Sequence, residues 1–61
     1  MNDARFEAFK GKNGDWYVRL RARNGRILVV SEGYTGRKEA IRASATIRTT
    51  AIDAVILEVK K

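Results

Sequence analysis

The sequence predicts a small α+β domain: a three-stranded antiparallel meander, one helix packed on one face, and a C-terminal strand, completed by dimerisation. Two segments alternate between apolar and polar residues, as half-buried strands do. An Asn-Gly pair at 24–25 marks a hairpin. Residues 37–50 carry an apolar stripe at helical spacing. At 61 residues the chain, 1–61, has room for a single domain.

Residues 5–10 and 16–23 are expected to form the first two strands, since they are rich in aromatic and β-branched residues. In the second, one face carries Trp16, Val18, Leu20 and Ala22, and the other carries Tyr17, Arg19, Arg21 and Arg23. A three-residue loop at 12–14, with Gly14 in the left-handed conformation, keeps the two apolar faces aligned and sets Glu7 opposite Arg19. We therefore predict this register rather than a two-residue turn at 13–14.

For the second hairpin, a two-residue turn at Asn24-Gly25 is predicted. It pairs Ala22 with Ile27 and continues the apolar face into a third strand. The opposite face then carries Phe9, Tyr17, Leu28 and Val30 among several arginines. Because both faces of the meander hold apolar residues, one helix cannot cover them all.

The helix is expected from about Arg37 to Thr50, with Thr35 or Gly36 as N-cap and fraying by Thr49 among the β-branched residues. Its apolar stripe comprises Ala40, Ile41, Ser44, Ala45 and Ile47. The run at 54–59 is apolar nearly throughout, as in a strand covered on both sides. We expect it to join a sheet edge, either of its own chain or of a partner.

Several of these elements together resemble the YegP-like family of small uncharacterised proteins. They are Phe6-Glu7 and Lys10, Gly14-Asp15-Trp16, Arg19-Leu20, Asn24-Gly25, Ser31-Glu32-Gly33-Tyr34, and a helix opening with Lys38 and Ala40. The resemblance covers about residues 5–55. It implies a three-stranded meander with a helix on one face, and dimers or a two-repeat chain that imitates one. It implies no known activity.

The composition narrows the function classes. Histidine and cysteine are absent, which excludes disulfides and the usual zinc and iron sites, and the seven acids are scattered. We therefore expect no metal, no cofactor and no catalytic residue, since no base could activate a hydroxyl nucleophile. The first ten residues are mixed and charged, unlike a signal peptide, and no apolar run approaches the roughly 18 residues of a membrane span. A cytoplasmic protein without a membrane contact is expected.

Thirteen basic residues against seven acidic ones give a net charge of +6, which suits nucleic acid or another anionic partner, or simply solubility. Three readings remain open, and none identifies a small-molecule ligand. The first is a homodimer that buries either Phe9, Tyr17, Leu28 and Val30, or the strand with Val55, Leu57 and Val59. The second is a nucleic-acid binder that uses Arg19, Arg21, Arg23, Arg37 and Lys38. The third is an anion site in the loop 33–38 before the helix, whose glycines could equally serve the turn alone.

Overall fold

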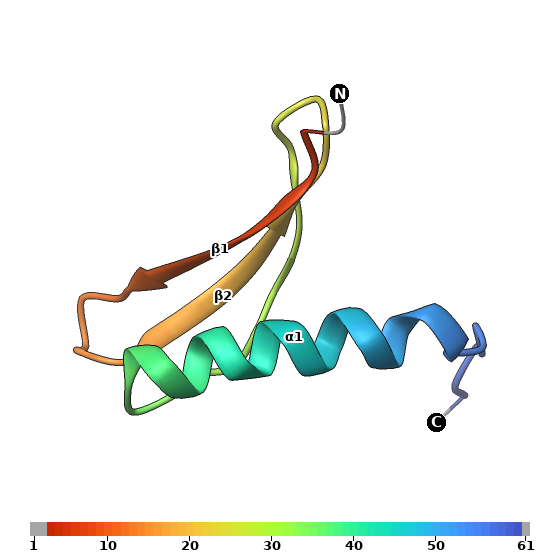
Figure 1. The fold of residues 1–61 in the computed structure, drawn as a ribbon. Coiled ribbons are helices and arrows are strands. Elements are labelled where there is room, and N and C mark those ends of the chain that lie inside the picture. Colours follow the sequence, from red (N-terminus) through yellow and green to blue (C-terminus); the bar gives the residue numbers. More distant parts are fainter. Residues whose placement is uncertain (1–2, 61) are drawn as a thin grey trace.

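The computed structural model describes residues 3–60 as three strands followed by one helix (Figure 1). The elements are β1 (Arg5–Lys10), β2 (Trp16–Arg21), β3 (Ile27–Val30) and α1 (Arg37–Asp53). β2 lies between β1 and β3 in one antiparallel sheet, and α1 packs against β1 and β2. The predicted α+β class, with its three-stranded meander and single helix, is confirmed.

The hairpin between β1 and β2 has the predicted register. Glu7 pairs with Arg19, and side chains alternate between the two faces on either side of this pair. The Gly11 N–H donates to the Asp15 carbonyl at 2.8 Å, which closes a three-residue loop. Gly14 in that loop has a φ of 91°, a left-handed conformation that residues with a Cβ rarely adopt. The alternating pattern and the glycine therefore fix the register together.

The hairpin between β2 and β3 differs from the predicted two-residue turn. The Ala22 N–H donates to the Arg26 carbonyl at 2.8 Å, so three residues form the loop here as well. Gly25 takes a φ of 90°, and the Asn24 side-chain oxygen accepts a hydrogen bond from the Arg26 N–H at 3.0 Å. This side-chain bond stabilises the turn locally, as asparagine commonly does. The prediction of a two-residue turn is wrong.

The longer loop shifts the start of β3 by one position. Ile27 pairs with Arg21 instead of Ala22, which places it on the face away from α1. A bulge between Leu20 and Arg21 then accommodates Leu28 as one extra residue in β3. Beyond the bulge, Leu20 pairs with Val29, as predicted.

The helix begins where expected and ends later. Gly36, one of the two predicted N-caps, has extended backbone angles and provides no side-chain cap. α1 runs on to Asp53 rather than fraying by Thr49, because β-branched residues cost only tenths of a kcal/mol each in a helix. At its end the Ala54 N–H donates to the Ala51 carbonyl at 3.2 Å.

The helix face that meets the sheet is rotated from the predicted stripe. Ala40 is fully buried and Ser44 is half-buried, both as predicted. Ile41 and Ala45, however, are exposed, and the half-buried Ala43 completes the contact instead. Small residues at this contact let α1 approach the sheet closely.

The core is correspondingly small. Among the residues that the structure describes, Val18 (2% exposed) and Ala40 are the only buried apolar side chains. Phe6 and Leu20 beside them are half-buried. A domain of about 60 residues has little interior by geometry alone, so most apolar side chains keep contact with water.

The segment 54–60, called the tail below, forms no strand within the described chain and is exposed throughout. The prediction of a strand that joins an edge of its own sheet is therefore wrong. With 17 residues, α1 is about 26 Å long and carries the tail away from the strands (Figure 1). Pairing with the edge of a partner's sheet stays a prediction.

Candidate interaction surfaces

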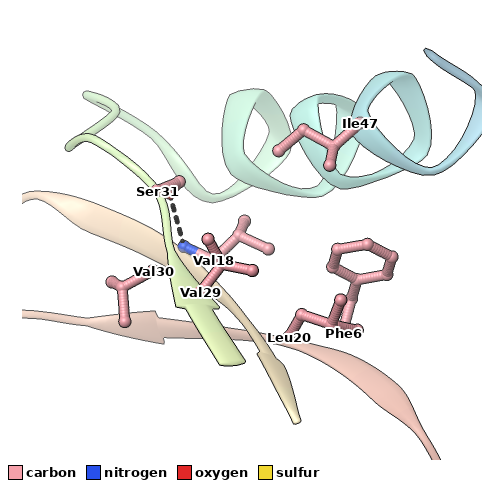
Figure 2. Close-up of a pocket in the computed structure, with 7 residues that line it drawn as sticks. All are labelled: Phe6, Val18, Leu20, Val29, Val30, Ser31 and Ile47. Carbon is pink, nitrogen blue, oxygen red and sulfur yellow. Dashed lines mark hydrogen bonds between the residues drawn. The ribbon is translucent and has the colours of Figure 1, made fainter. Parts of the chain in front are cut away.

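The sheet has two faces of different character. α1 covers part of one face, toward which Phe6 and Val18 point (Figure 2). The other face, called the outer face, carries residues of the opposite parity along each strand. These residues are Arg5, Glu7, Phe9, Tyr17, Arg19, Arg21, Ile27 and Val30.

Three arginines on the outer face share one carboxylate. The Glu7 oxygens accept hydrogen bonds from Nε of Arg5 and Arg19 at 2.7 Å each, and from Nε of Arg21 at 3.1 Å. The hydrogen bond from Arg19, then that from Arg5, lowers the pKa of Glu7 from 4.5 to about 2. The carboxylate is therefore ionised at neutral pH. Three guanidinium groups and one carboxylate leave this arginine cluster with two net positive charges.

Two aromatic rings lie beside the arginine cluster. Phe9 and Tyr17 stack with centroids 5.7 Å apart and planes at 23°, and the Arg19 guanidinium carbon lies 4.6 Å from the Phe9 centroid. The Tyr17 hydroxyl accepts a hydrogen bond from Asn13 Nδ2 at 2.9 Å. Its ring also lies so close to Gly11 that a Cβ there would come within 2.6 Å of Cε1. The rings are thus held in fixed positions.

The structure divides the residues predicted to bind anions into two groups. Arg19 and Arg21 meet at Glu7, and Arg23 is exposed in the next turn. Arg37 and Lys38 are exposed in the first turn of α1, in the layer on the other side of the sheet. One continuous surface does not contain all five.

The loop 33–38 does not present an open helix terminus. The Glu39 carboxylate folds back against Gly36, the N-cap, and occupies the space that a Cβ would need there. An acid in the first turn already satisfies the positive end of the helix dipole. Upstream, the Ser31 hydroxyl accepts from the Val18 N–H at 2.9 Å and donates to the Glu32 carbonyl at 2.8 Å. These contacts favour a structural role for the loop.

On the helix side, the sheet is open where β3 lies. A cavity of about 90 Å³, called the groove below, lies between the sheet and α1 (Figure 2). It is lined by Phe6, Val18, Leu20, Val29, Val30, Ser31 and Ile47, none of which is charged. Figure 2 shows the Val30 side chain pointing away from Ile47. Of these two β3 valines, Val29 is therefore the one that faces the helix side of the sheet. Val29 is 58% exposed because α1 packs on β1 and β2 only.

The predicted dimer-interface residues also fall into two sets. Phe9 and Tyr17 are half-buried on the outer face, while Leu28 and Val30 on β3 are 62% and 51% exposed. The tail residues are more exposed, at 76% for Val55, 99% for Ile56, 76% for Leu57 and 82% for Val59. Water contact of this extent on consecutive apolar side chains is unfavourable for the single chain.

A family model described as a domain of unknown function (DUF1508) matches residues 12–58. The chain belongs to this family. The resemblance to the YegP-like group of small uncharacterised proteins is confirmed by relatives that carry the name UPF0339 protein. The family carries no enzymatic name.

Two relatives and one solved structure show how much of the chain the similarity covers. The UPF0339 protein of Methanosarcina acetivorans is 35% identical over 54 residues, which are 88% of this chain and 93% of that protein. The one from Treponema denticola is 33% identical over 55 residues, 90% and 95% of the respective chains. An NMR solution structure of a protein from Haloferax volcanii is 33% identical with a TM-score of 0.86, covering 97% of this chain and all of that one.

Sequence reasoning found the Glu7–Arg19 pair of this DUF1508 domain but missed the cluster around it. Arg5 and Arg21 are displaced by two positions from that pair on the same face, a spacing that long side chains can bridge. Within residues 3–60, no set of three acidic, histidine or cysteine side chains is grouped to hold a metal ion. No helix in that range has the length and apolarity to span a bilayer.

Proposed function

We propose that this chain is a non-catalytic homodimeric interaction module, in which the tail of each copy covers the groove of the other. One observation carries the proposal: an apolar groove lies open beside β3 while an apolar tail is 76–99% exposed at Val55, Ile56 and Leu57. The tail has exposed apolar side chains, and the groove has an apolar lining against which they could be buried. The absence of histidine and cysteine from the sequence supports a role without catalysis.

The charge distribution favours the groove over the outer face as the dimer interface. A face-to-face contact of two outer faces would bring two arginine clusters together, each with net positive charge. Like charges across an interface oppose association. The lining of the groove and residues 54–57 carry no charge, so their contact involves no such repulsion.

Backbone geometry supports the same pairing. β3 is an edge strand, and its free side presents N–H and C=O groups that an extended segment can pair with. Alternate side chains of an extended segment share a face, so Val55, Leu57 and Val59 would meet the groove together. Burying these three would contribute about 4.5–9 kcal/mol per tail before the cost of association. A two-fold symmetric dimer contains two such contacts, and association at micromolar concentration requires a net gain of about 8 kcal/mol from them.

Light scattering after size exclusion at micromolar concentration tests the proposal. The expected mass is about twice the 6.9 kDa of one chain. Leu57→Asp should convert the dimer to a monomer, because it places a charge on the buried tail. Thr35→Asp adds the same charge at an exposed loop residue and should leave the mass unchanged. A wild-type mass of 6.9 kDa, or equal masses for both variants, would contradict the proposed interface.

A further inference from the structure

We propose that the outer face binds single-stranded nucleic acid, with the arginine cluster on the phosphates and the Phe9–Tyr17 pair beside a base. The interaction does not depend on dimerisation. The outer face is opposite the groove, so a partner copy on the groove leaves the arginines accessible.

Charge complementarity points to a polyanion. Arg5, Arg19 and Arg21 converge on Glu7, which neutralises only one of the three. Arg23 and Arg26 follow in the adjoining turn and are both exposed. The positive charge therefore continues from the middle of β2 along the sheet to its end. A chain of regularly spaced phosphates matches a row of this kind.

The arginines are also oriented before any ligand arrives. Glu7 takes the Nε hydrogen of each arginine. One terminal nitrogen of Arg5 and one of Arg21 also donate to backbone carbonyls, whereas among the described residues the terminal nitrogens of Arg19 have no hydrogen-bond acceptor. Those nitrogens form the fork that suits phosphate oxygens. Because Glu7 holds the stems in place, less side-chain freedom is lost on binding than for separate surface arginines.

The shape of the face favours a single strand over a duplex. The major groove of a duplex admits a helix or a two-stranded ribbon, whereas this face is three strands wide. Single strands lie across sheets of this kind and place bases against aromatic or guanidinium planes. Phe9 is already stacked on Tyr17 and Arg19, so phosphate contacts contribute most of the affinity and no sequence preference is expected.

Fluorescence anisotropy with labelled oligouridylate and oligothymidylate of roughly 15 nucleotides tests this assignment. Three phosphate contacts predict that affinity falls about 18-fold as salt rises from about 50 to about 200 mM. Arg19→Gln removes one contact and should reduce that fall to about 7-fold. Arg48→Gln makes the same charge change on α1 and should leave it at about 18-fold.

Circular dichroism confirms folding of each variant, and Arg5→Gln, at a side chain 54% exposed, replaces Arg19→Gln if the latter does not fold. Comparable affinity for the RNA and the DNA strand supports a backbone-directed site. The proposal is overturned by no binding at about 50 mM salt, or by an equal effect of Arg48→Gln. Equal affinity for a duplex or for a polyglutamate peptide overturns it as well, since either shows that charge alone is recognised.

Discussion

Val18→Ala should lower the free energy of unfolding by about 2 kcal/mol. Val18 is 2% exposed at the centre of β2, beneath α1. The substitution removes two methyl groups, worth about 0.8 kcal/mol each, and enlarges the adjoining 90 Å³ cavity. For a domain of this size, that loss corresponds to a fall in Tm of roughly 8–16 °C.

Thermal denaturation followed by circular dichroism at one fixed protein concentration measures the effect. Val30→Ala deletes the same groups from a side chain that is 51% exposed on the outer face, and should cost less than about 1 kcal/mol. A loss below about 0.5 kcal/mol for Val18→Ala would refute the assignment of the core. A loss as large for Val30→Ala would show that a partner covers the outer face, contrary to the proposed interface.

Three further predictions concern charge and backbone. Glu7 has a pKa of about 2 in the fold against an ordinary 4.5. Its ionised carboxylate therefore stabilises the folded state fully above about pH 4.5, and this stabilisation is lost as pH falls toward 2. Glu7→Gln should remove this part of the pH dependence of Tm. Gly14→Ala should cost about 1–2 kcal/mol in urea denaturation, purely from its φ of 91°, because open space surrounds the position; an unchanged midpoint would contradict this. Gly11→Ala should cost about 1–3 kcal/mol by displacing the Tyr17 ring, and loss of the Tyr17 contacts in NMR spectra is the expected signature.

Most of the fold could be predicted because alternation and turn chemistry agree over β1 and β2. The register around Glu7 and Arg19 follows from parity alone. The second hairpin was missed although the signal was present: Lys12-Asn13-Gly14 and Arg23-Asn24-Gly25 are the same pattern, and both form three-residue loops. The Asn13 and Asn24 side chains accept from the N–H two residues on, at 3.0 Å in each case. Asn-Gly alone does not specify loop length. The pattern of a basic residue followed by Asn-Gly corresponds to a three-residue loop at both hairpins.

The candidate surfaces were harder to predict, because they depend on how far each element extends. The apolar stripe of α1 includes Ile41 and Ala45, and periodicity could not show that only one flank of that stripe meets the sheet. The convergence of three arginines on Glu7 depends on side-chain length and rotamer across two strands. Hydrophobic pattern predicts which face is buried, but not which charged side chains meet on the other one.

α1 extends beyond the sheet that it covers. Where α1 packs on β1 and β2, Ala40 is buried, Ala43 and Ser44 are half-buried and Ile47 lines the groove, whereas Ile52 in the last turn is 78% exposed. The last turn of α1 and the tail extend beyond the strands (Figure 1), and their apolar side chains are exposed. The arginine cluster around Glu7 lies on the opposite face of the sheet. If both proposals hold, the apolar partner and the anionic partner would approach from opposite sides of the sheet, so a second copy on the groove would not compete with a polyanion on the outer face.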